Sequence, residues 1–84
     1  MPFSQTVANF LDQQFPGSQI RMHDPGGDRA MGTIISSDFQ GLYEEARLQL
    51  VWGHLRTHFG AQATRIGVLL LFTPGEEASL KKSN

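Results

Sequence analysis

The feature that most constrains the fold is an apolar run near the C-terminus, Val-Leu-Leu-Leu-Phe, followed directly by Thr-Pro-Gly-Glu. Five apolar residues are too few to cross a bilayer and are typical of a buried strand. A strand over residues 65–72 with so continuous a run is expected to lie centrally or to be covered on both faces. Thr73 can then cap a helix, Pro74 suits its first position, and Glu76 can return to the cap amide. The sequence therefore predicts a strand that passes into a short helix over residues 77–82.

A first helix is indicated near the N-terminus, where apolar residues recur at helical spacing. These residues are Val7, Phe10, Leu11 and Phe15. Ser4 is the expected N-cap, and the pair Pro16 and Gly17 is expected to end the helix.

Two strands joined by a loop are expected next. Ile20 and Met22 alternate with polar residues, which is the period of a half-buried strand. Residues 24–28 read Asp-Pro-Gly-Gly-Asp and predict a loop or turn. The β-branched residues 33–35 predict the core of a second strand that ends near Ser36.

A long helix is predicted over about residues 42–59. Ser36, Ser37 and Asp38 precede it and supply several possible N-caps, and Gly60 fits its C-terminal end. Its apolar stripe, with spacings of three and four, consists of Leu48, Val51, Trp52, Leu55 and Phe59.

Three further residues of this helix bear on its surroundings. Glu44 and Glu45 lie in its first turns, where the helix dipole favours anions. Gly53 lies inside the helix and costs up to about 1 kcal/mol relative to alanine. We expect it to be required by close packing against a strand or another helix.

These elements predict a single α+β domain over residues 1–84, with the order α-β-β-α-β-α and helices packed on a three-stranded sheet. A chain of 84 residues can build one modest core. We expect residues 1–3 and 81–84 to fray.

Composition excludes several classes of protein. The chain has seven basic and eight acidic residues, whereas a protein that coats DNA without sequence preference is usually strongly basic. The absence of cysteine excludes a disulfide scaffold and a cysteine-ligated zinc or iron–sulfur site of the chain's own. Residues 1–15 have no basic start and no long apolar run, so we expect no signal peptide, no membrane partner and a cytoplasmic location.

Three histidines are weak candidates for a metal site. His54 and His58 lie four residues apart on one helix face, and His23 or a carboxylate could complete a ligand set. A hydrolytic zinc motif would need glutamate after His54, where this chain has Leu55. Solvated histidines, or histidines that favour the helix C-terminus, are the preferred interpretation.

No residue pattern indicates catalysis. Ser36 and Ser37 are better explained as helix caps than as nucleophiles. The glycine pair in residues 24–28 is flanked by two aspartates, which repel phosphate, and no P-loop lysine follows. We therefore expect a protein that is not an enzyme.

The middle of the chain carries a recognisable pattern. Residues 34–41 read Ile-Ile-Ser-Ser-Asp-Phe-Gln-Gly, residues 47–52 read Arg-Leu-Gln-Leu-Val-Trp, and residues 66–69 read Ile-Gly-Val-Leu before Thr-Pro-Gly-Glu. Over residues 10–77 the chain resembles the BolA family, small proteins of order αββαβα whose fold is related to the type II KH domain.

The resemblance implies a non-enzymatic regulatory or adaptor protein, such as a DNA-binding transcription regulator with a helix-turn-helix region. In that region, backbone amides at a helix start meet phosphate, and arginines add positioning charge. The implied residues for binding DNA or a protein partner are Ser36, Ser37, Phe39, Gly41, Arg47 and Arg65.

A second implied partner is a monothiol glutaredoxin, with which BolA-like proteins share a [2Fe–2S] cluster. The family's helix histidine falls at Leu48 and its strand histidine, the cluster ligand, at Gly67. Ligation would then need His23, His54 or His58 as a substitute, and we expect no cofactor bound by this chain alone. The third alternative is a diverged protein-interaction domain that has lost cluster ligation, as a monomer or weak dimer.

Overall fold

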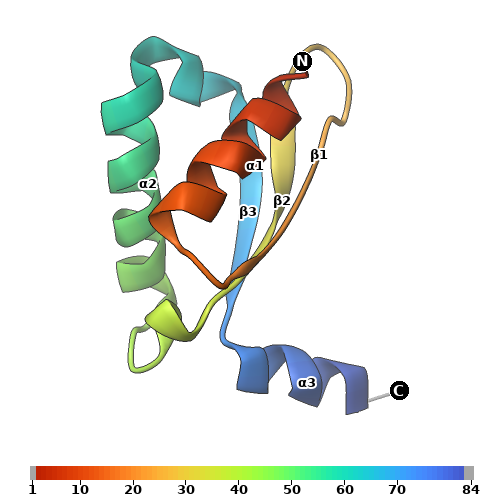
Figure 1. Ribbon diagram of the computed structural model, residues 1–84, viewed down its shortest axis with the longest axis vertical. Helices are drawn as coiled ribbons and strands as arrows, with labels where there is room; N and C mark the ends of the chain where they lie inside the picture. Colours follow the sequence, from red (N-terminus) through yellow and green to blue (C-terminus); the bar gives the residue numbers. More distant parts are fainter. Residues whose placement is uncertain (1, 83–84) are drawn as a thin grey trace.

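The computed structural model describes residues 2–82, which form three helices and a three-stranded sheet (Figure 1). The predicted order α-β-β-α-β-α and the α+β class are confirmed. The elements are α1 (Phe3–Gln14), β1 (Gln19–His23), β2 (Ala30–Ile35), α2 (Glu44–Phe59), β3 (Ile66–Phe72) and α3 (Pro74–Lys82). Within residues 2–82, none of the helices is long and apolar enough to cross a membrane.

The strands are ordered β1-β2-β3. β1 and β2 form an antiparallel hairpin, whose loop is turned by Gly26, Gly27 and Asp28 with positive φ. β2 and β3 are parallel, and α2 makes the crossover between them. The predicted loop and both hairpin strands are confirmed.

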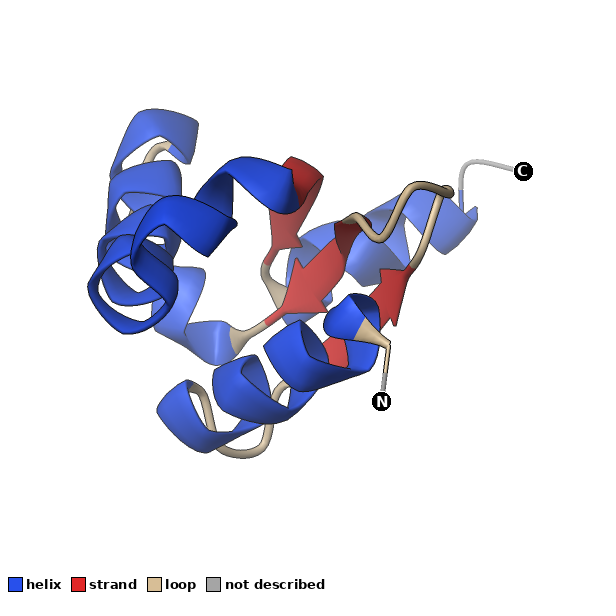
Figure 2. Cartoon of the chain, turned by 90° about the horizontal axis from the view of Figure 1, so that it is seen from above, coloured by secondary structure: helices blue, strands red, loops and turns tan. Residues whose placement is uncertain are grey.

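The core lies on one face of the sheet. Alternate residues of β2, namely Ala30, Gly32 and Ile34, are buried there. α1 and α2 contribute the opposite wall through Val7, Leu11, Val51 and Leu55, all fully buried. In the view from above, α3 lies on the opposite side of the strands from α1 (Figure 2).

Gly32 is the position where the hairpin depends on a missing side chain. A Cβ added there would meet the backbone carbonyl oxygen of Arg21 and lie 2.8 Å from Cα of Met22. Backbone cannot yield as a flexible side chain can, so the close approach of β1 to β2 requires glycine here.

Two of the predicted N-caps are wrong. α1 is capped by Pro2 rather than Ser4, which lies in its first turn and is buried. Ser36 caps a short 3-10 helix over Ser37–Phe39 by accepting a hydrogen bond from the Asp38 amide, 3.1 Å. The long helix begins after this turn, with Tyr43 at its N-cap, and ends at Gly60 as predicted.

The prediction that the third strand is central or covered on both faces is also wrong. β3 is at the edge of the sheet, and Val68 and Leu70 are 60% and 50% exposed. An irregular register between Ala30–Ile66 and Gly32–Leu69 inserts one extra residue into β3. The bulge turns Val68 toward the face opposite the core.

Gly53 is not explained by packing, because a Cβ added there meets nothing within 4 Å. Helix α1 begins at the buried Phe3, and helical backbone of α3 extends to Lys82. The expected fraying of residues 1–3 and 81–84 stays a prediction, and residues 1 and 83–84 lie outside the described residues.

Candidate functional site

A groove of about 580 Å³ lies where the C-terminal end of β3 meets the starts of α2 and α3. We call it the β3–α3 groove. Its lining residues are Leu42, Tyr43, Glu44, Arg47, Leu70, Leu71, Phe72, Glu76, Ser79 and Leu80.

Apolar side chains dominate the exposed part of this groove. Leu70 of β3 is half-exposed, Leu80 of α3 is 54% exposed, and Tyr43 is almost fully exposed. Val68 continues the apolar surface along β3. Large exposed apolar side chains are ordinary when scattered, but a contiguous group indicates a contact surface.

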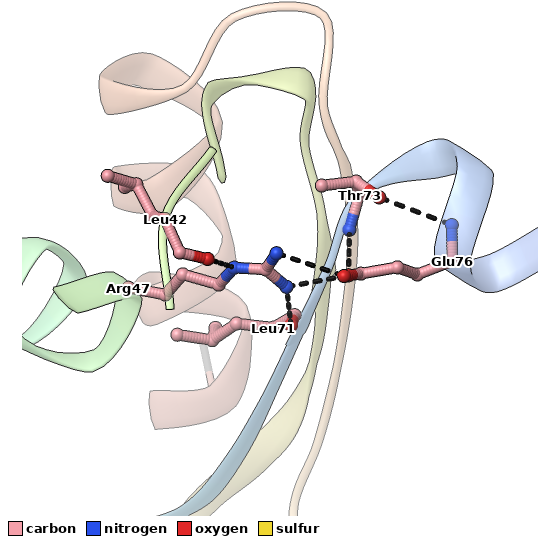
Figure 3. A network of polar contacts seen from close by, with 5 residues as sticks. All are labelled: Leu42, Arg47, Leu71, Thr73 and Glu76. Atoms are coloured by element: carbon pink, nitrogen blue, oxygen red, sulfur yellow. Dashed lines mark hydrogen bonds and ion pairs between the residues drawn. The ribbon is translucent and has the colours of Figure 1, made fainter. Parts of the chain in front are cut away.

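Arg47 organises the groove by bridging three elements (Figure 3). Its Nε donates to the Leu42 carbonyl at 2.8 Å, and its Nη1 donates to the Leu71 carbonyl at 3.1 Å. Nη1 and Nη2 also bind the two carboxylate oxygens of Glu76 at 2.6 and 3.0 Å. This two-pronged pairing is the geometry in which a guanidinium binds carboxylate most strongly.

Glu76 also forms the predicted capping box with Thr73, and this prediction is confirmed. Its Oε1 accepts from the Thr73 amide at 2.9 Å, and its own amide donates to Thr73 Oγ1 at 3.2 Å (Figure 3). The hydrogen bond from Arg47, followed by that from Thr73, lowers the pKa of Glu76 to about 2. The same pairing with Glu76 raises the pKa of Arg47.

The polar contacts also fix which way the backbone of β3 points. The Phe72 carbonyl accepts from the Ser36 amide, on the β2 side, at 2.9 Å. Carbonyls alternate in direction along a strand, so the Leu71 carbonyl points to the outer edge, where Arg47 binds it. Arg47 therefore closes the outer edge at Leu71, and in the described part of the chain no strand pairs with the edge before it.

The six residues expected to bind DNA or a partner do not form one exposed surface. Phe39 is fully buried in the core, and Ser36 is buried and occupied as a cap. Ser37 is exposed, and Gly41, at φ +80°, forms the exposed turn before α2. The side chain of Arg47 is only 11% exposed.

Arg65 is likewise engaged within the fold. Its Nε donates to the Asp28 carbonyl at 2.9 Å, and its Nη2 forms an ion pair with the Asp28 carboxylate. Its guanidinium carbon also lies 4.3 Å from the ring centroid of Phe3. Arg65 thus links the β1–β2 loop to the start of β3, whereas Arg47 binds at the other end of that strand.

His54 and His58 line one groove, but His23 lies elsewhere, so the three histidines do not come together. The ring of His58 stacks on Phe10 at 4.1 Å between centroids, and His54 meets Phe15 edge-on at 5.6 Å. Both line a second groove, between α1 and α2, whereas His23 ends β1. Residues 2–82 contain no group of three or more side chains from His, Cys, Asp and Glu that could hold a metal ion.

Gly67, at the position where the resemblance would place a cluster-ligating histidine, lies on the face opposite the core. A Cβ added there would lie 3.8 Å from the Ala30 carbonyl oxygen and 4.0 Å from Cβ of Met31. His23 pairs with Met31 across β1 and β2, so Met31 stands between His23 and Gly67. No protein-family model and no curated protein matches the chain.

No sequence pattern directly indicates the β3–α3 groove. The ion pair between Arg47 and Glu76 joins residues 29 positions apart, and no local pattern predicts such a pair. One signal was available in the apolar run itself. A run with no polar residue fits an edge strand only when its second face serves as a contact surface.

Proposed function

We propose that this chain is a non-enzymatic adaptor domain that binds an extended segment of a partner protein along the outer edge of β3. The observation that carries the proposal is the exposed apolar face of an edge strand, Val68 and Leu70, continuous with the β3–α3 groove. Edge strands normally carry charges or other features that prevent pairing. An edge without them is the kind of surface to which a peptide adds as a further strand.

The backbone supports this mode of binding over a short stretch. Since the Leu71 carbonyl points outward, the alternation along β3 directs the backbone groups of Leu69 to the same edge. Arg47 occupies the edge at Leu71 and sets the point where pairing ends. A partner segment would pair before that point and continue into the groove.

Charge favours a protein partner over nucleic acid. Residues 36–47 contain three acidic side chains and one arginine. That arginine is neutralised by Glu76, and Arg65 is paired with Asp28. The first turn of α2, where phosphate would meet helix amides, already carries Glu44 and Glu45. Phosphate binding depends on free positive charge, which this surface lacks.

The proposal is tested by selecting displayed random dodecapeptides on the immobilised domain. We expect the selected peptides to lose at least about tenfold in affinity for the L70K variant, because a lysine there places a charge on the contact surface. The matched control is L50K, which makes the same change at an exposed leucine of α2 in the other groove. Equal binding to wild type, L70K and L50K would overturn the proposal.

Two defined partners complete the test. Because of the family resemblance, a monothiol glutaredoxin is the first protein to test. We expect the L70K variant to lose any complex with it. In such a complex, Gly67 would supply no ligand to the [2Fe–2S] cluster. Duplex DNA is titrated at 50 and 200 mM salt, and we expect no amide shifts in residues 37–47. Salt-dependent shifts there would favour nucleic acid over a protein partner.

A further inference from the structure

Resting on the adaptor function proposed above, we infer that the β3–α3 groove selects a basic–apolar segment: an apolar anchor that enters the groove and an adjacent lysine or arginine that meets Glu44. Three of the described lining residues are charged: Glu44, Arg47 and Glu76. Arg47 and Glu76 neutralise each other through a doubly hydrogen-bonded pair. The carboxylate of Glu44 therefore sets the net charge of the lining at −1.

Arg47 does not offer a competing site for an acidic partner. Its three nitrogens are all engaged, Nε with the Leu42 carbonyl and Nη1 and Nη2 with the Leu71 carbonyl and Glu76. An incoming carboxylate would have to displace Glu76, which also holds the start of α3. The pair thus makes the groove unfavourable to an acidic group, whereas the attraction for a basic group comes from Glu44.

The starts of the two helices are also closed to anions. The amides of Thr73 and Glu76 at the start of α3 are satisfied within the capping box. At the start of α2, Glu44 and Glu45 lie in the first turn, where their negative charge opposes the binding of an anion to the helix dipole. The negative charge of Glu44 is the one left unbalanced in the described lining, and a cationic group would balance it.

The apolar part of the lining defines the anchor. Leu70, Leu80 and Tyr43 are exposed around a hollow of about 580 Å³. A hollow of that size accepts a bulky side chain. Because Arg47 ends the free edge at Leu71, the anchor enters the groove at the point where strand pairing stops. The recognised segment therefore combines an extended stretch with an anchor and a cationic residue at one end.

The test uses two labelled, end-capped hexapeptides, one alternating lysine with valine and the other glutamate with valine. Fluorescence anisotropy measures their affinity for wild type, E44Q and E45Q at 50 mM salt. E45Q removes the same charge from the next residue, which is outside the lining. We expect the lysine peptide to bind more tightly than the glutamate peptide, and E44Q to weaken it about two- to five-fold while E45Q changes it less than twofold.

The outcomes separate this inference from the proposed function. Equal affinity for the two peptides, equal effects of E44Q and E45Q, or no binding of the lysine peptide at 1 mM would each overturn the charge selection. The adaptor function would survive those results if peptides selected by display still required Leu70. Loss of that dependence on Leu70 would overturn both.

Discussion

The two edge strands of the sheet, β1 and β3, differ in polarity on the face away from the core: β1 is polar there and β3 is apolar. β1 exposes Gln19, Arg21 and His23 there, and Arg21 donates to the Gln19 side chain at 3.0 Å. β3 exposes Val68 and Leu70. Polar and charged side chains on an edge discourage pairing with another chain. The difference indicates that the exposed face of β1 is suited to contact with water and that of β3 to contact with a partner.

The largest effect is expected at Gly32 of the central strand β2, where β1 approaches closely. G32A should lower the free energy of unfolding by about 4 kcal/mol or more, because its Cβ would meet the backbone of β1 at Arg21 and Met22. G67A is the control, because its Cβ finds ordinary contacts, the nearest at 3.8 Å. It should change stability by less than about 1 kcal/mol. Urea unfolding measures both, and equal effects would contradict the register of the hairpin.

The second test separates the two faces of β3 at neighbouring positions. L69A should destabilise the protein by about 2 to 4 kcal/mol, because Leu69 is buried in the core. L70A should change stability by less than about 1 kcal/mol, since Leu70 is half-exposed, while it weakens binding of selected peptides. Thermal or urea unfolding measures the free energy of unfolding of both variants. A larger loss of stability from L70A would place Leu70 in the core and remove the contact surface.

The third test concerns the pH range over which α3 stays fixed beside the groove. The pKa of Glu76 is lowered from its ordinary 4.5 to about 2, mainly by its hydrogen bond from Arg47. A depressed carboxyl pKa contributes stability that is fully present above pH 4.5 and is lost as the pH falls through 2. The protection of the α3 amides, taken as the exchange rate relative to the intrinsic rate at the same pH, should therefore fall between pH 4.5 and 2. E76Q should already show lower protection in α3 at pH 7, with little further loss of protection on acidification.

The smallest effect is expected at a position remote from both edges. G53A should stabilise the protein by up to about 1 kcal/mol, because the helix gains a better helix former and the new Cβ meets no atom within 4 Å. A loss of stability in thermal unfolding would show that Gly53 is needed for packing within the chain.

Much of the fold was predictable because its signals are local. The capping box at Thr73 and Glu76, the alternation of Ile20 and Met22, and the stop at Gly60 each depend on residues a few positions apart. The start of α2 was misplaced by two residues because the serines before it cap a separate 3-10 turn.

The site was less predictable because its parts come together only in the folded chain. The expectation that Arg47 adds positioning charge for a ligand does not foresee that its guanidinium binds Leu42, Leu71 and Glu76 within the fold. Phe39 is expected at the binding surface only through the family resemblance, and a sequence pattern does not show that its ring is buried in the core. The apolar run of β3 was interpreted as a covered strand, whereas one of its faces is open.

The central claim is that β3, and not β1, is the contact surface. The most direct measurement is a map of backbone amide shifts in ¹⁵N-labelled protein as a display-selected peptide is added. The account predicts shifts concentrated in β3, Ile66–Phe72, and at the start of α3, with β1 unchanged. Shifts centred on Gln19–His23, with β3 unaffected, would contradict it.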